Sequence, residues 1–544
     1  MSYLILNGLA LPASISASSG ELSVAGSTLG LRVSRKISIE SGSIAVDGTA
    51  VSVKADRKIT LESGELTVEG TVVTLKRSNI PISIESGELT IGGTVVLLKA
   101  TRASPIESGA LSVEGSSLTL TVTRKLSIES GSISIDGSDP LLERSRLFPV
   151  ESGALTIDGT AVGLKTALSV SPGALAIDGS TLGLKVTRTL PIESGALAID
   201  GTAASLEAGR TVAPEAGALA VEGSTLGLRV DRKLSTDSGE LTIDGSAVSI
   251  VQAPKIFLIE SGSLSIEGSA VDLTRTKEVY IRSGSLQITG STLKLKYKRI
   301  FHIESGSMVI GGSAVTFNRT TYNFPVSPGA MTVRGAGLGF KRNSNYTIYL
   351  EPGLMTVNGV SINMPIGGDR RLSIESGSMT IAGTATELSR IRKLKATKGS
   401  LSIQGTPVSF VRAGDRSITL EPGVMRIAGT AVSLKVAVPS ITIEPGSLHI
   451  DGSPVDLRKG RTLVPDKGSL SVTGGALNLE YGRVLKPDHG HLSVTGSEIT
   501  FNRSVLYAKI SFTFGTVYSK LNFGSDKPVF ELEIKATPEF VFGS

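Results

Sequence analysis

A glycine recurs along this chain every 20 to 24 residues, usually every 22, and it does so twenty-two times. A second glycine follows six residues after each one, and the residues two and four after the first glycine are always aliphatic or Met. A period this short and this strict predicts one repetitive architecture rather than a set of globular domains. The first glycines lie at positions 20, 42, 64, 87, 109, 131, 153, 173, 195, 217, 239, 262, 284, 306, 329, 353, 377, 399, 423, 446, 468 and 490.

One copy, residues 42–61, shows the structure that the repeat predicts. Apolar and polar residues alternate in three short runs, which is the period-two pattern of half-buried strands. Two glycines per copy and many β-branched residues oppose a helix. The fold class is therefore all-β. The residues expected to point inward in this copy are Ile44, Val46, Val51, Val53, Ile59 and Leu61.

Three kinds of turn separate the strands. Asp-Gly and Asn-Gly pairs tolerate a positive φ in a tight turn, and Glu-Ser-Gly or Glu-Pro-Gly is expected to place its glycine at a positive φ as well. The third turn is basic and variable in length, as at residues 54–57. The structural turn residues predicted on this basis include Gly42, Gly48, Gly64, Gly70, Gly353 and Gly359.

Three strands and three corners per repeat of about 22 residues favour one coil of a three-sided β-solenoid, with each coil pairing to the next. The alternative is a long antiparallel meander, because all three turns could also close hairpins. The first apolar segment is short and the remainder of the copy is longer, which does not suit simple up-and-down strands. We divide the chain into an N-terminal cap at 1–19, the array of about 22 β-repeats at 20–504, and a C-terminal segment at 505–544.

The C-terminal segment is a second strand-forming region with a different composition. It contains eight aromatic residues, whereas aromatics make up 4% of the whole chain. Aromatic side chains are common anchors at interfaces, so this segment is expected to be a cap, an attachment surface or both. The residues predicted to bind a partner are Tyr507, Phe512, Phe514, Tyr518, Phe523, Phe530, Phe540 and Phe542.

Composition excludes several classes of protein. The chain has no Cys, so neither disulfides nor thiolate metal sites stabilise it. Its 55 basic and 49 acidic residues are interspersed and give a net charge of only +6, without the basic and aromatic clusters of a nucleic-acid binder. No apolar run reaches the roughly 20 residues that a membrane-spanning helix needs, and no secretory signal is visible, so we expect no membrane insertion.

Candidate chemistry is sparse. The carboxylates of Glu40, Glu62, Glu85, Glu107, Glu129 and Glu151 recur as a corner ladder, which we interpret as a solvated surface. No irregular cluster of acids and bases predicts an active site, so we expect no enzyme activity and no cofactor. Two of the four histidines, His489 and His491, are the only metal candidates, since three such pairs at a trimeric tip would supply an octahedral metal. The simpler interpretation is that both are exposed turn residues.

In its Cys-free strand-and-turn repeats and distinct aromatic terminus, the array at 20–504 resembles repetitive virion structural proteins of tailed bacteriophages, such as fibres. The resemblance implies a non-catalytic rod or fibre in a virion, made in the host cytoplasm and extracellular after release. It implies a homo-oligomer whose partners are other virion proteins or copies of itself, with a host-surface glycan as a further candidate. A bacterial extracellular filament or adhesin and a polysaccharide-degrading solenoid enzyme are the alternatives.

Overall fold

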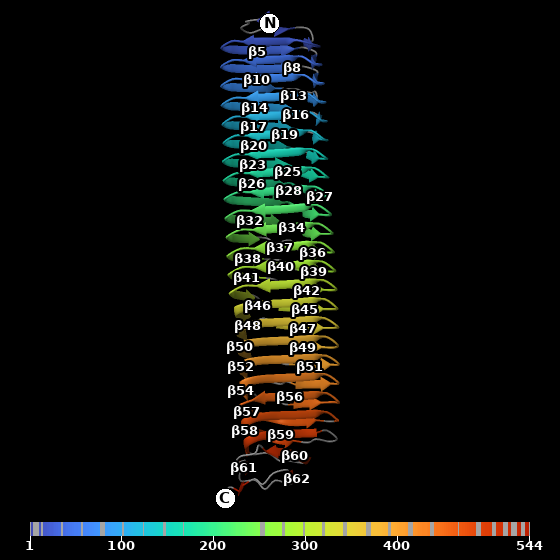
Figure 1. Cartoon of the computed structure of the whole chain (residues 1–544), viewed down its shortest axis with the longest axis vertical. Helices are drawn as coiled ribbons and strands as arrows, with labels where there is room; N and C mark the ends of the chain where they lie inside the picture. Colours follow the sequence, from blue (N-terminus) through green and yellow to red (C-terminus); the bar gives the residue numbers. More distant parts are fainter. Residues whose placement is uncertain are drawn as a thin grey trace. The chain divides into compact units, whose positions relative to one another are not determined.

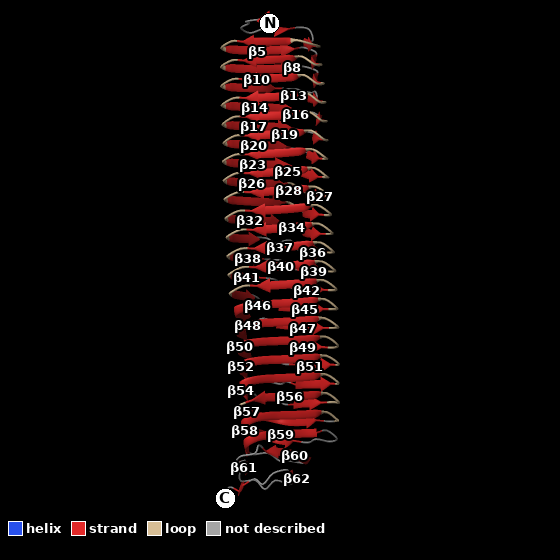
Figure 2. Ribbon diagram, in the orientation of Figure 1, coloured by secondary structure: helices blue, strands red, loops and turns tan. Residues whose placement is uncertain are grey.

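The computed structural model consists of strands joined by short bends, and the residues that it describes form no helix (Figure 2). Two compact units, Met1–Ser269 and Ala270–Ser544, each contain stacked coils of strands (Figure 1). The structure describes residues 2–3, 10–11, 15–33, 36–55, 58–76, 82–100, 103–122, 125–144, 148–166, 168–250, 256–274, 278–296, 300–317, 321–340, 345–365, 371–389, 393–411, 417–435, 440–465, 467–485, 491–502, 508–514, 520–523, 530–534 and 539–542.

A coil of the first unit has three strands, exemplified by β7 (Ser43–Asp47), β8 (Ala50–Ala55) and β9 (Lys58–Leu61). Each strand pairs in parallel with the equivalent strand one coil away, so that β10 (Glu65–Glu69) lies on β7 with Leu66 opposite Ile44. A meander would instead pair consecutive strands in antiparallel fashion. The parallel register therefore confirms the predicted β-solenoid and rules out the alternative.

The first strand of each coil carries the residues discussed below. In each coil, a second and a third strand follow the first strand along the chain. These pairs begin with β5 (Thr28–Val33) and β6 (Lys36–Ile39) and continue to β35 (Ala247–Ile250) and β36 (Ile256–Ile259). The first strands of the first unit are β4 (Glu21–Ala25), β7, β10, β13 (Glu88–Gly92), β16 (Ala110–Glu114), β19 (Ser132–Asp136), β22 (Ala154–Asp158), β25 (Ala174–Asp178), β28 (Ala196–Asp200), β31 (Ala218–Glu222), β34 (Glu240–Asp244) and β37 (Ser263–Glu267).

The core is a set of aliphatic columns, one for each inward position of the coil. All six residues predicted to point inward in the copy at 42–61 are buried, with exposed fractions of 2% or less. Because equivalent residues pair directly, most inward aliphatic side chains lie on an aliphatic side chain of the next coil, as Val68 does on Val46. Alternation within a strand is therefore sufficient to build the core.

The corner glycines are required for a different reason from the one the sequence suggested. Gly20 and Gly223 have positive φ angles of 106° and 151°, but Gly42, Gly48, Gly64, Gly70, Gly353 and Gly359 do not have φ in the left-handed region. A Cβ added to any of these six would lie closer than 3.0 Å to a carbonyl oxygen of the preceding coil. The expectation of positive φ was wrong for them. Glycine is needed there because backbones of successive coils approach closely at the bends.

Serine at the Glu-Ser-Gly bend links successive coils. The Ser63 hydroxyl donates to the carbonyl oxygen of Glu40 at 2.6 Å, and the Ser63 N–H donates to the same oxygen at 2.8 Å. The same hydroxyl contact recurs at 2.8 Å from Ser108, Ser130 and Ser152 to the carbonyls of Glu85, Glu107 and Glu129. We call this row of contacts the serine ladder. Each hydroxyl adds a second donor to a bend carbonyl that already accepts from the serine backbone N–H.

In the second unit the first and second strands of several coils form one continuous strand. Examples are β46 (Ala330–Phe340), β48 (Leu354–Pro365), β50 (Ser378–Ser389), β52 (Ser400–Val411) and β54 (Val424–Lys435), which pass through the second glycine of the repeat. They pair in parallel with one another, with Gly335, Gly359 and Gly383 in one column. Strand pairing therefore continues through this glycine, as at Gly359, whereas a break separates the two strands at the equivalent position of the first unit.

Candidate functional site: an acidic ladder in the first unit

Eight carboxylate residues form one column at the ends of successive first strands. Glu114 lies opposite Asp136, and Asp158 lies between Asp136 and Asp178. The same register continues from β25 to β37. We call this column the acidic ladder, and its members are Glu114, Asp136, Asp158, Asp178, Asp200, Glu222, Asp244 and Glu267.

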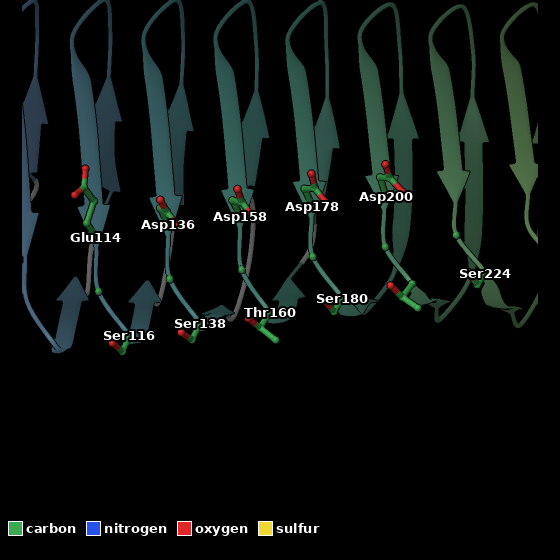
Figure 3. Close-up of a pocket in the computed structure, with 17 residues that line it drawn as sticks. Glu114, Ser116, Asp136, Ser138, Asp158, Thr160, Asp178, Ser180, Asp200 and Ser224 are labelled. Atoms are coloured by element: carbon green, nitrogen blue, oxygen red, sulfur yellow. The ribbon is translucent and has the colours of Figure 1, made fainter.

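Hydroxyl side chains accompany the acidic ladder. Two residues after each carboxylate, past the bend glycine, the chain places Ser or Thr, as at Ser116, Ser138, Thr160, Ser180 and Thr202. Figure 3 shows the carboxylates in one row and the hydroxyls in a second, parallel row. Together with the bend backbone they line an open polar groove of about 890 Å³. The groove extends over several coils rather than converging on one point.

Four carboxylates in the middle of the acidic ladder have no ion-pair partner among the described residues. Successive coils are about 4.8 Å apart, so neighbouring carboxylates repel each other by roughly 1 kcal/mol in water before screening by salt. Asp136, Asp158, Asp178 and Asp200 are exposed. Within the described part of the chain, no Lys or Arg lies within ion-pair distance of these four carboxylates. The column therefore stores a repulsion that a cationic partner would relieve.

The fold itself does not require these carboxylates. In the second unit the equivalent position of the coil is occupied mainly by uncharged residues, with Arg334 and Asp451 as charged members, and the coils still pair in register. A neutral side chain at this position is therefore compatible with the same strand pairing. The residues at this position in the second unit include Thr289, Gly311, Arg334, Asn358, Ala382, Gln404 and Ala428.

Opposite charge gathers at another edge of the same unit, where the second strand ends and the third begins. Three carboxylates at this edge are already ion-paired, for example Glu207, whose Oε2 lies 2.9 Å from the Nζ of Lys185. Lys185 holds the pKa of Glu207 below its usual value. The other two are Glu143, with Lys165, and Asp231, with Arg229. We call the cations here the basic edge; they are Lys36, Lys54, Lys58, Lys99, Lys125, Lys165, Lys185, Arg188, Arg210, Arg229, Arg232 and Lys233.

In the second unit, the outer column of the third strands includes three aromatic side chains, those of Tyr280, His302 and Tyr349. The rings of Tyr280 and His302 stack with centroids 4.8 Å apart and planes 2° from parallel. The Tyr349 hydroxyl donates to Oε1 of Glu375 at 2.5 Å, and this hydrogen bond, with burial and the nearby carboxylates, raises the pKa of Tyr349 to about 12. Each of these pairs joins two neighbouring coils. Like the ion pairs of Glu143 and Glu207, they join residues that are neighbours along a column.

The predicted metal candidates receive no metal site from the structure. His491 is exposed at the start of β59 (His491–Asn502), and His489 lies outside the described residues. Among the residues that the structure describes, no three His, Asp or Glu side chains are grouped so as to hold a metal ion. The described residues also contain no helix that is long and apolar enough to cross a membrane.

Six of the eight predicted partner-binding aromatics lie on strands that continue the parallel pairing. β60 (Ala508–Phe514) pairs with β59, placing Phe512 opposite Val494, and β61 (Lys520–Phe523) pairs with β59 beside it. β62 (Phe530–Ile534) and β63 (Glu539–Phe542) pair with β60 and β61. Tyr507 and Tyr518 lie outside the described residues. A role for this segment as a cap or attachment surface stays a prediction.

The acidic ladder does not stand out from the sequence patterns considered above. Asp-Gly pairs such as Asp158-Gly159 suit a tight turn, and the recurring charge that was noted is the Glu of the Glu-Ser-Gly corner. The signal was present, because the residue before the second glycine is Asp or Glu in every repeat from Glu114 to Glu267. Aligning the repeats by their glycines would have revealed the column. No family model, curated protein or solved structure matches this chain.

Proposed function

We propose that this protein is a non-catalytic structural component of an elongated bacteriophage appendage, in which the stacked coils act as a spacer. The observation that carries the proposal is that equivalent side chains of successive coils form continuous columns. Aliphatic residues lie on aliphatic residues, bend serines donate to the bend carbonyls of the preceding coil, and carboxylates lie on carboxylates. The repeated residues of such a chain therefore serve mainly to stack the coils uniformly.

Catalysis calls for a different arrangement. An active site brings a nucleophile, an acid or base and a stabilising donor to one point. The described columns place like residues side by side, and the polar groove of the acidic ladder runs along the coils without converging. The shifted pKa values of Glu207 and Tyr349 arise within ladders that join neighbouring coils. These features favour a structural role over a polysaccharide-degrading enzyme.

The virion setting rests on the resemblance of the repeats to phage fibres, and it can be tested directly. Antibodies raised against the purified chain are applied to particles from a lysate of the source culture and viewed by negative-stain electron microscopy. We expect label on a projecting part of phage particles. Label on cell envelopes and none on particles would overturn the virion assignment and favour the bacterial filament or adhesin.

A second experiment tests the absence of catalysis. The full chain is incubated with envelope glycans extracted from the host, and their size distribution is followed by chromatography. We expect the glycans to keep their size, whether or not they bind. Depolymerisation that a heat-treated sample of the same preparation does not produce would refute the structural proposal.

A further inference from the structure

We propose that the acidic ladder of one copy of this chain binds the basic edge of a second copy, so that coils associate side by side. This contact would join copies of a spacer protein, and only that biological setting rests on the proposed function. Three features of the first unit carry it. They are the unpaired carboxylates Asp136, Asp158, Asp178 and Asp200 of the ladder, the cations of the basic edge at the same coil spacing, and the small side chains beside the ladder.

The first feature is that the ladder is both repulsive and dispensable for folding. Asp158, Asp178 and Asp200 stand in direct register, and the described residues give them no cationic partner. The second unit shows that uncharged residues fit the same position, for example Ala382 and Gln404. A repulsive column that the fold does not need is explained by a partner that neutralises it.

The geometry favours an extended cationic partner over a metal ion. Ca²⁺ takes about six to eight oxygens converging on one point. The carboxylates of the ladder lie one per coil in a straight row, with the hydroxyls in a separate row (Figure 3). An array of single charges at a regular spacing is complementary to an array of opposite charges with that same spacing.

The basic edge provides shorter arrays of this kind on the same molecule, with Thr121, Glu143 and Glu207 interrupting the column of cations at the end of the second strands. Lys36 and Lys58 are in register on adjacent coils, and Lys54 and Lys99 belong to one column at the end of the second strands. Since both arrays are set by the same coil-to-coil spacing, several pairs can form at once when two copies lie alongside. The ion pair of Lys185 with Glu207, at 2.9 Å between adjacent coils, shows that side chains of this edge bind carboxylates.

The surface beside the ladder allows close approach. In β25 and β28 the outward side chains before the carboxylate are all alanines: Ala174, Ala176, Ala196 and Ala198, each of them exposed. Long lysine and arginine side chains of a second copy can lie over these methyl groups and reach the carboxylates. Because the two contacting surfaces differ, the contact is heterologous and either closes into a ring or continues as an open assembly.

The test is the mass of the purified full chain in sedimentation equilibrium at about 0.05 M and about 1 M NaCl, with EDTA present throughout. We expect association at low salt and its loss at high salt, where the screening length falls to about 3 Å. The triple variant Asp158→Asn, Asp178→Asn, Asp200→Asn is expected to weaken association at least about tenfold. A control variant, Glu387→Gln, Glu444→Gln, Glu498→Gln, changes three exposed carboxylates of the second unit and should associate like the parent.

Exchanging the charges of the acidic ladder and the basic edge between two variants tests whether these two surfaces bind each other. The variants Asp158→Lys, Asp178→Lys, Asp200→Lys and Lys54→Glu, Lys99→Glu should each associate poorly alone, and their mixture should recover association. A monomer at every concentration at low salt would overturn the contact, and so would association that is unaffected by the triple variant. Either result would leave the spacer role standing, because that role is tested by antibody labelling and glycan size. Circular dichroism of every variant confirms that it is folded.

Discussion

Replacing the bend glycine Gly64 by alanine tests the packing between coils. The added Cβ would lie closer than 3.0 Å both to the carbonyl oxygen of Gly42 and to Cγ2 of Ile39. A backbone oxygen and a buried β-branched side chain cannot move aside easily, so the coils must separate locally. That separation strains the hydrogen bond from the Glu65 N–H to the Gly42 oxygen, which is 3.1 Å long in the parent.

The magnitude follows from these two effects. Overpacking a tight site costs about 1–3 kcal/mol, and weakening a backbone hydrogen bond costs about 0.5–1.5 kcal/mol. We therefore expect Gly64→Ala to lower the free energy of unfolding by roughly 2–4 kcal/mol. The measurement is guanidinium unfolding of the full chain followed by circular dichroism, with amide hydrogen exchange to locate the loosened coils around residue 64.

The matched control is Gly30→Ala, which makes the same chemical change on the outer face of a strand. A Cβ at Gly30 meets nothing within 4 Å, and its φ is not in the left-handed region. Alanine there restricts the unfolded chain, so we expect a gain of about 0.4–1 kcal/mol. Equal effects of the two variants, or a cost below about 0.5 kcal/mol for Gly64→Ala, would refute the account of the corner glycines.

Three further changes test other parts of the structure. Val68→Asp buries a carboxylate at a position 1% exposed and should destabilise by about 4 kcal/mol or more, whereas Lys54→Ser should stay within about 0.5 kcal/mol; similar melting temperatures would contradict the inward and outward assignment. Changing Ser108, Ser130 and Ser152 together to Ala removes three hydroxyl contacts but leaves backbone donors on the same carbonyls. We expect the free energy of unfolding in guanidinium to fall by about 1.5 kcal/mol. An unchanged free energy of unfolding would refute the stabilising role of the serine ladder. Since the pKa of Tyr349 is raised to about 12, its hydrogen bond stabilises the fold below about pH 10 and is lost as pH rises through about 12; spectroscopic titration, with Tyr349→Phe as the reference, should show that pKa fall towards 10 in Glu375→Gln, and an unchanged value would contradict the role of the Glu375 carboxylate.

The fold was predictable because the alternation of apolar and polar residues defines the strands, and the 22-residue period defines the coils. Ile44 and Val46, two residues apart, define one inward face, and the recurrence of that pattern every 22 residues defines the next coil. No information beyond the strand period is needed to place them in the core.

The role of the glycines and the acidic ladder could not be read in the same way. A glycine such as Gly64 suits a positive φ and a close backbone approach equally well, and only the position of Gly42 distinguishes them. Asp158 and Asp178 are 20 residues apart in sequence, where each looks like a solvated turn residue, and they become neighbours only when coils stack. Likewise, nothing local in residues 354–365 reveals that the strand continues past Gly359.

The serine ladder has a direction, because the hydroxyl of Ser63 reaches back to Glu40, 23 residues earlier, and that of Ser86 reaches back to Glu62, 24 residues earlier. A chain that leaves the ribosome N-terminus first can therefore lay each new coil on a finished one. Every loop it closes has nearly the same length, so the entropic cost per coil does not grow as the chain lengthens. Repeats can then be gained or lost by duplication without changing how any other coil folds.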